Sequence, residues 1–173
     1  MKVERLLQIL DGIQSQIRFL DTKAQIVLGI DGVMAGFLGL HTKTIASAVF
    51  DRWLSWPSIG LEIFYAAYLI AVVLSLYWVF KTVYPRTDVN QPKSRIFFIH
   101  IAENYQEDYK RVSTELVDMS DEELSDDTSK QILANSRVGL EKYESLKKAV
   151  VWMAISVFCW ISILTLLFVA AKA

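Results

Sequence analysis

The sequence contains a single cysteine, Cys159, which lies in an apolar run. One cysteine excludes an intramolecular disulfide and a cysteine-based zinc site. The chain also lacks any long block of Lys and Arg, and its formal net charge is −1, so we expect no binding to nucleic acid. A phosphate-binding glycine loop, a nucleophile elbow and a paired His and carboxylate motif are missing as well. We therefore expect neither an enzyme nor a resident cofactor or metal.

Charged residues are also scarce, because they make up 21% of the chain whereas 53% is hydrophobic. Apolar segments cover residues 24–40, 61–80 and 149–171, and about 20 residues are needed to cross roughly 30 Å of hydrocarbon. The sequence therefore predicts an all-α membrane protein with three transmembrane helices at these positions. Residues 1–23 are rich in polar side chains, unlike a secretory signal, so we expect the first span to be retained.

The Lys and Arg residues indicate how the three spans are oriented. Fifteen of them lie in residues 1–23 and 81–148, whereas three lie in the connector 41–60 and the C-terminal tail. The positive-inside rule then places the amphipathic N-terminal helix 1–23 and the helical region 81–148 in the cytoplasm, with the connector outside. Aromatic residues suited to the inner membrane–water boundary are Tyr77, Trp78 and Trp152.

Two helical patterns divide the region 81–148. One runs from Phe98 to Met119, and the second resumes at Thr128 through apolar positions that include Ile132, Leu133, Leu140, Tyr143 and Leu146. The stretch SDEELSDD lies between them, and its Ser120 and Glu123 have capping-box spacing. It indicates a solvated turn and helix start better than a metal site, because it lacks the spaced ligands of a calcium loop. No proline or glycine cluster follows, so we expect one long helix into the membrane and a cytoplasmic helical bundle.

The sharpest periodicity lies in the first 40 residues. Apolar side chains recur there at alternating spacings of three and four, which predicts a packing face along one continuous helix. We call this set the N-terminal stripe; it comprises Val3, Leu6, Leu10, Ile13, Ile17, Leu20, Ala24, Val27, Asp31, Met34 and Leu38. Asp31 is thus a carboxylate on a packing face inside a membrane span.

Asp31 needs a polar partner, because a carboxylate at a span centre costs about 2.5 to 3.5 kcal/mol on insertion scales. The second and third spans contain no Lys, Arg or His. The available partners are the Asp31 side chain of a neighbouring subunit or the hydroxyls of Tyr68, Ser75, Ser156 and Ser162. We expect a hydrogen-bonding or pore-lining role for Asp31.

Two other faces of the first span have distinct compositions. Bulky side chains on one face suit lipid: Ile26, Ile30, Val33, Phe37 and Leu40. Small residues on the other permit close helix packing in hydrocarbon: Gly29, Gly32, Gly36 and Gly39. With one face for packing inside the subunit and one for packing between subunits, the sequence predicts a homo-oligomer. The alternative is that every contact belongs to three-helix packing within one chain.

Three blocks of the sequence resemble the transmembrane Pycsar effectors, the PycTM-like family. They are FLDTKAQIVLGIDGVMAGFL, YPR followed by FFIHIAENYQEDYKRVSTEL, and SKQILANSRVGLEKYESLKKAV, with polar residues such as Asp21, Lys23, Gln131, Ser136, Lys142 and Tyr143. The resemblance implies a role in bacterial antiphage defence. A partner pyrimidine cyclase would make cyclic CMP or cyclic UMP on infection. This ligand would activate the cytoplasmic part, and the spans would then impair inner-membrane integrity in the lipid bilayer and cause abortive infection.

A site for a cyclic mononucleotide needs a cationic donor, amide or hydroxyl groups, and an aromatic or apolar wall. Residues of the cytoplasmic region that could supply these groups are Arg86, Lys93, Arg95, Gln131, Asn135, Arg137, Lys142 and Tyr143. Lys and Arg near span ends also occur for orientation alone. The competing function is a membrane scaffold whose helical module binds another protein and no nucleotide. A proton-linked transporter built around Asp31 is disfavoured, because three spans show no internal repeat.

Overall fold

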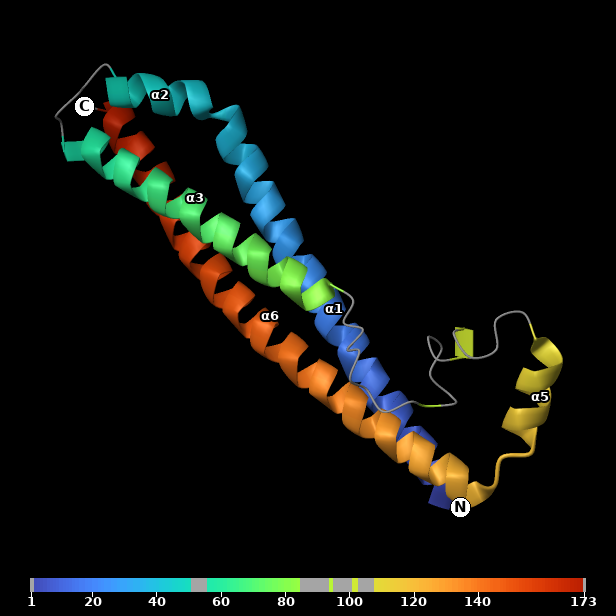
Figure 1. The fold of residues 1–173 in the computed structure, drawn as a ribbon. Coiled ribbons are helices and arrows are strands. Elements are labelled where there is room, and N and C mark those ends of the chain that lie inside the picture. Colours follow the sequence, from blue (N-terminus) through green and yellow to red (C-terminus); the bar gives the residue numbers. More distant parts are fainter. Residues whose placement is uncertain (1, 51–55, 85–93, 95–100, 103–107, 173) are drawn as a thin grey trace. The chain divides into compact units, whose positions relative to one another are not determined.

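The computed structural model describes residues 2–50, 56–84, 94, 101–102 and 108–172, and among these residues it contains helices and no strands (Figure 1). Three helices are long and apolar enough to cross a membrane, which confirms the predicted all-α membrane protein. They are α1 (Lys2–Leu40), α3 (Trp56–Val83) and α6 (Asp121–Lys172). Two short helices are α2 (Thr42–Phe50), in the connector, and α5 (Tyr109–Val117).

The chain divides into two compact units. Residues 1–19 and 85–141 form one, which we call the polar unit, and residues 20–84 and 142–173 form the other, which we call the membrane unit. The apolar segments of all three long helices belong to the membrane unit. Helices α1 and α6 each contribute residues to both units.

The membrane unit is held together by packing among α1, α3 and α6, which run side by side (Figure 1). Helix α3 is antiparallel to the others, so that Gly60 near its start lies against Leu166 near the end of α6. Each of two core clusters takes side chains from all three helices. One contains Met34, Leu38, Leu61 and Ile163, and the other contains Ala24, Val27, Val79, Leu146 and Ala149.

The N-terminal stripe is the packing face of α1, as its spacing predicted. All eleven of its side chains are buried or half-buried, whereas every other residue between positions 3 and 40 is exposed, apart from half-buried Asp21. The periodicity of apolar residues therefore identified the buried face along the whole helix.

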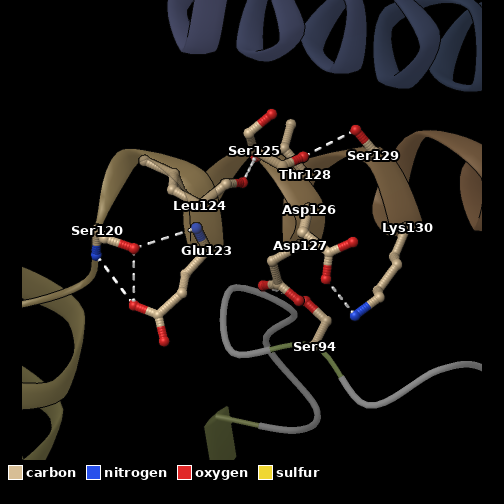
Figure 2. Close-up of polar contacts among 10 residues, drawn as sticks. All are labelled: Ser94, Ser120, Glu123, Leu124, Ser125, Asp126, Asp127, Thr128, Ser129 and Lys130. Carbon is tan, nitrogen blue, oxygen red and sulfur yellow. Dashed lines mark hydrogen bonds and ion pairs between the residues drawn. The ribbon is translucent and has the colours of Figure 1, made fainter.

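The start of α6 is the predicted capping box. The Ser120 backbone N–H and hydroxyl both donate to Glu123 Oε2 at 3.1 Å, and the Glu123 N–H donates to Ser120 Oγ at 3.3 Å (Figure 2). These bonds satisfy backbone donors that a helix start leaves open. The acidic run is thus the first turns of α6, which then continues unbroken to Lys172.

Two details of the region 81–148 differ from expectation. The pattern from Phe98 predicted a single helix. Residues 101–102 are helical, but Asp108 has a non-helical ψ of 76° and its side chain caps the Arg111 N–H, so that α5 begins at Tyr109. Residues 95–100 and 103–107 lie outside the described residues. On α6, Leu133 and Leu140 were expected to pack but are 55% and 63% exposed. Polar residues occupy buried positions of α6 instead.

Candidate functional site

Asp31 lies in the interior of the membrane unit and is 1% exposed. Ser75 of α3 donates its hydroxyl to Asp31 Oδ2 at 2.6 Å, and the Ser156 hydroxyl of α6 lies 3.2 Å from Oδ1. Both serines are fully buried. One polar side chain from each of the three long helices thus meets the others in the interior of the membrane unit. We call Asp31, Ser75 and Ser156 the polar core.

Two of the four hydroxyls that the sequence offered are therefore the partners of Asp31. Ser162 instead donates to the Phe158 carbonyl of its own helix at 2.9 Å. The Tyr68 hydroxyl is buried without a hydrogen-bond partner among the residues that the structure describes. Hydroxyls of the same subunit satisfy the Asp31 carboxyl, so contact with a neighbouring Asp31 is not needed. The pore-lining role stays a prediction.

Each serine of the polar core has a second acceptor on α6. Ser75 Oγ lies 3.4 Å from the Ala149 carbonyl oxygen, and Ser156 Oγ lies 2.8 Å from the Met153 carbonyl oxygen. A hydroxyl carries one hydrogen and can donate to only one acceptor well. Both serines could therefore turn to the α6 backbone if the carboxyl moved away. Each serine hydroxyl therefore has an acceptor within reach whether or not it donates to Asp31.

The glycine face of α1 points away from the polar core. Apart from chain neighbours and the local α1 backbone, no described atom lies within 4 Å of the position that a Cβ would take on its four members, Gly29, Gly32, Gly36 and Gly39. The adjacent bulky face is also exposed, with Val33 at 76% and Leu40 at 85%. The glycines thus make no close contact within this subunit, and their packing role stays a prediction that concerns a second subunit.

The structure describes only some of the predicted nucleotide contacts. Arg86, Lys93 and Arg95 lie outside the described residues. In the polar unit, Gln131 is 4% exposed, and Asn135 follows it one turn later, half-buried on the same helix. Arg137 is exposed.

Sequence reasoning missed a buried carboxylate, Asp127, that lies one turn before Gln131 on α6. Asp127 is 7% exposed, and its Oδ2 accepts a hydrogen bond from the buried Ser94 hydroxyl at 2.9 Å (Figure 2). The neighbouring Asp126 instead faces solvent, and its hydrogen bond to Lys130 raises the pKa of that ammonium above its ordinary value. Within an acidic run, no local signal distinguishes the buried carboxylate from the exposed one.

Lys142 and Tyr143 belong to the membrane unit. The Lys142 ammonium contacts Asp21 Oδ1 at 2.5 Å, and the lysine side chain is 9% exposed. This ion pair joins α1 to α6, so two polar residues that the family resemblance singled out separately are partners. Tyr143 is 52% exposed. The ammonium of Lys142 is therefore engaged in helix packing, whereas the Tyr143 ring is open to a ligand.

These features define an all-α membrane protein whose three spans enclose a polar core and whose first and last helices continue into a second helical unit. The PycTM family, described as the Pycsar effector protein domain, matches residues 5–169. The chain belongs to this family, and it is an antiphage membrane effector. The resemblance seen in the three sequence blocks is thereby confirmed. No curated protein and no solved structure matches the sequence.

Proposed function

We propose that this chain is an inner-membrane effector that cyclic CMP or cyclic UMP activates and that then impairs membrane integrity, so that the infected cell undergoes abortive infection. Family membership carries the proposal, because the match over residues 5–169 includes most of both units. A pyrimidine cyclase is the functional partner that supplies the ligand. The N-terminus and residues 81–148 face the cytoplasm, where that nucleotide is made.

The polar unit supplies nucleotide contacts in this proposal. The Gln131 and Asn135 amides offer both donors and acceptors to a base or ribose, and Arg137 offers positive charge to the phosphate. Gln131 makes no hydrogen bond within the described part of the chain although it is 4% exposed, so a ligand could satisfy its amide. Lys142 is a weaker candidate, because its ammonium is bonded to Asp21.

Activation acts on the polar core through α1 and α6, which run without a break from one unit into the other. A ligand shifts only those equilibria whose states it binds differently. The polar core provides two such states, because Ser75 and Ser156 each have a second acceptor. In the open state Asp31 would line a water path between subunits, which assemble through the exposed glycine face.

Dye leakage from liposomes that contain the purified protein tests this function. We expect leakage with cyclic CMP or cyclic UMP and none with cyclic AMP. Asp31→Leu should alter leakage but leave nucleotide affinity nearly unchanged, because Asp31 lies in the membrane unit and the amides lie in the polar unit. If the protein is folded and no cyclic mononucleotide causes the liposomes to leak, the proposal is refuted. A stable protein partner on pull-down, with no nucleotide effect, would support the scaffold instead.

A further inference from the structure

Two lysines from different helices meet on one tryptophan in the membrane unit. The Lys81 ammonium of α3 lies 5.0 Å from the centroid of the Trp78 ring, and the Lys148 ammonium of α6 lies 4.3 Å from it. Tyr77 packs edge-on against Trp78 with 5.1 Å between ring centroids. We call Trp78, Lys81 and Lys148 the Trp78 cluster.

The Trp78 cluster lies where the apolar segments of both helices end. Lys81 directly follows the span 61–80, and Lys148 directly precedes the span 149–171. The Trp78 side chain packs against the core cluster that contains Val79 and Ala149. The indole is therefore anchored between the helices, while both ammonium groups reach the level at which hydrocarbon gives way to lipid headgroups.

The cluster brings two positive charges to one indole ring. Lys148 makes no ion pair with any described residue, although Glu144 lies one turn before it on α6. The neighbouring Lys147 is also exposed and adds another positive charge. Two ammonium groups beside one ring experience mutual repulsion. An anion bound between them would remove it.

We propose that the Trp78 cluster binds the phosphodiester headgroup of an anionic phospholipid, which the ammonium groups of Lys81 and Lys148 hold between α3 and α6. A lipid rather than a free phosphate is the occupant, because aromatic side chains beside the lysines are open to acyl chains. Tyr77 is 56% exposed and Phe80 is 64% exposed. Each lysine near an anionic membrane surface raises the affinity of a protein for that membrane roughly fivefold. The bound headgroup bridges two of the three spans independently of any nucleotide.

Native mass spectrometry of the full chain in detergent, with added phosphatidylglycerol or phosphatidylcholine, tests the proposal. We expect preferential binding of phosphatidylglycerol, and we expect Lys148→Gln to weaken it about fivefold. Lys147→Gln is the matched control, because it removes the same charge one residue away without touching Trp78. It should weaken binding clearly less than Lys148→Gln does.

Three outcomes would overturn the proposal. The first is equal binding of the two lipids, and the second is an equal loss of phosphatidylglycerol binding in the two lysine variants. The third is displacement of phosphatidylglycerol by glycerol 1-phosphate as effectively as by the lipid itself, which would indicate a site for free phosphate. Circular dichroism of each variant verifies that helix content is unchanged. Since no nucleotide is present, these results are independent of whether the protein responds to one.

Discussion

Removing the Ser75 hydroxyl should destabilise the membrane unit more than removing the Ser156 hydroxyl. Ser75 donates to Asp31 at 2.6 Å, and its alternative acceptor, the Ala149 carbonyl, lies 3.4 Å away. Ser156 lies 3.2 Å from the same carboxyl but only 2.8 Å from the Met153 carbonyl, to which it can donate in either state. Hydrogen bonds between membrane helices average about 0.6 kcal/mol and reach about 1.7 kcal/mol. We therefore expect Ser75→Ala to cost about 1 to 1.7 kcal/mol and Ser156→Ala about 0.6 kcal/mol or less.

The assay is equilibrium unfolding of the purified protein by SDS in mixed micelles, followed by circular dichroism. Ser162→Ala is the control, because the Ser162 hydroxyl donates to a carbonyl of its own helix, and its effect should stay within about 0.5 kcal/mol. Leakage without nucleotide should rise in the same order as the loss of stability. If Ser156→Ala or Ser162→Ala costs as much as Ser75→Ala, the assignment of the strong hydrogen bond to Ser75 is refuted.

Four other features give outcomes that the same unfolding measurement can check. Lys142→Met and Asp21→Asn should show a coupling of about 0.5 to 3 kcal/mol in a double-mutant cycle, and additive effects would contradict their 2.5 Å ion pair. Gly36→Leu should not lower the unfolding free energy, because no described atom outside the local α1 backbone lies within 4 Å of the added Cβ and leucine favours a helix more than glycine does. It should, however, lower the mass measured by light scattering; an unchanged mass would argue against a subunit contact there. Tyr68→Phe should raise the unfolding free energy by about 1 kcal/mol, since it removes a buried hydroxyl with no partner among the described residues; a decrease would show that this hydroxyl is bonded. Ser120→Ala should cost about 1 kcal/mol through loss of the helix cap, whereas Ser120→Asp should not, and equal losses would contradict the cap.

Local patterns in the sequence predicted α1 and its buried face well but predicted α6 only in part. Along α1 the buried positions are apolar except at Asp31, so the spacing of apolar residues gives the packing face directly. On α6 the buried positions include Gln131 and Lys142, which are 4% and 7% exposed, while Leu133 lies outward. A helix that buries polar side chains and exposes apolar ones misleads any count of hydrophobicity, and the partner that Lys142 finds in Asp21 lies on another helix.

The sequence by itself therefore determined the number of spans, the continuity of α1 and α6 and the register of Asp31 on its stripe, because each of these depends on spacing along one continuous segment. Only the tertiary structure decided which hydroxyls bond to Asp31, that Asp21 forms an ion pair with Lys142, and that two lysines contact the Trp78 ring. These pairings depend on the rotation and depth of α3 and α6 against their neighbours. Packing of all three helices sets both quantities, and no segment encodes them alone.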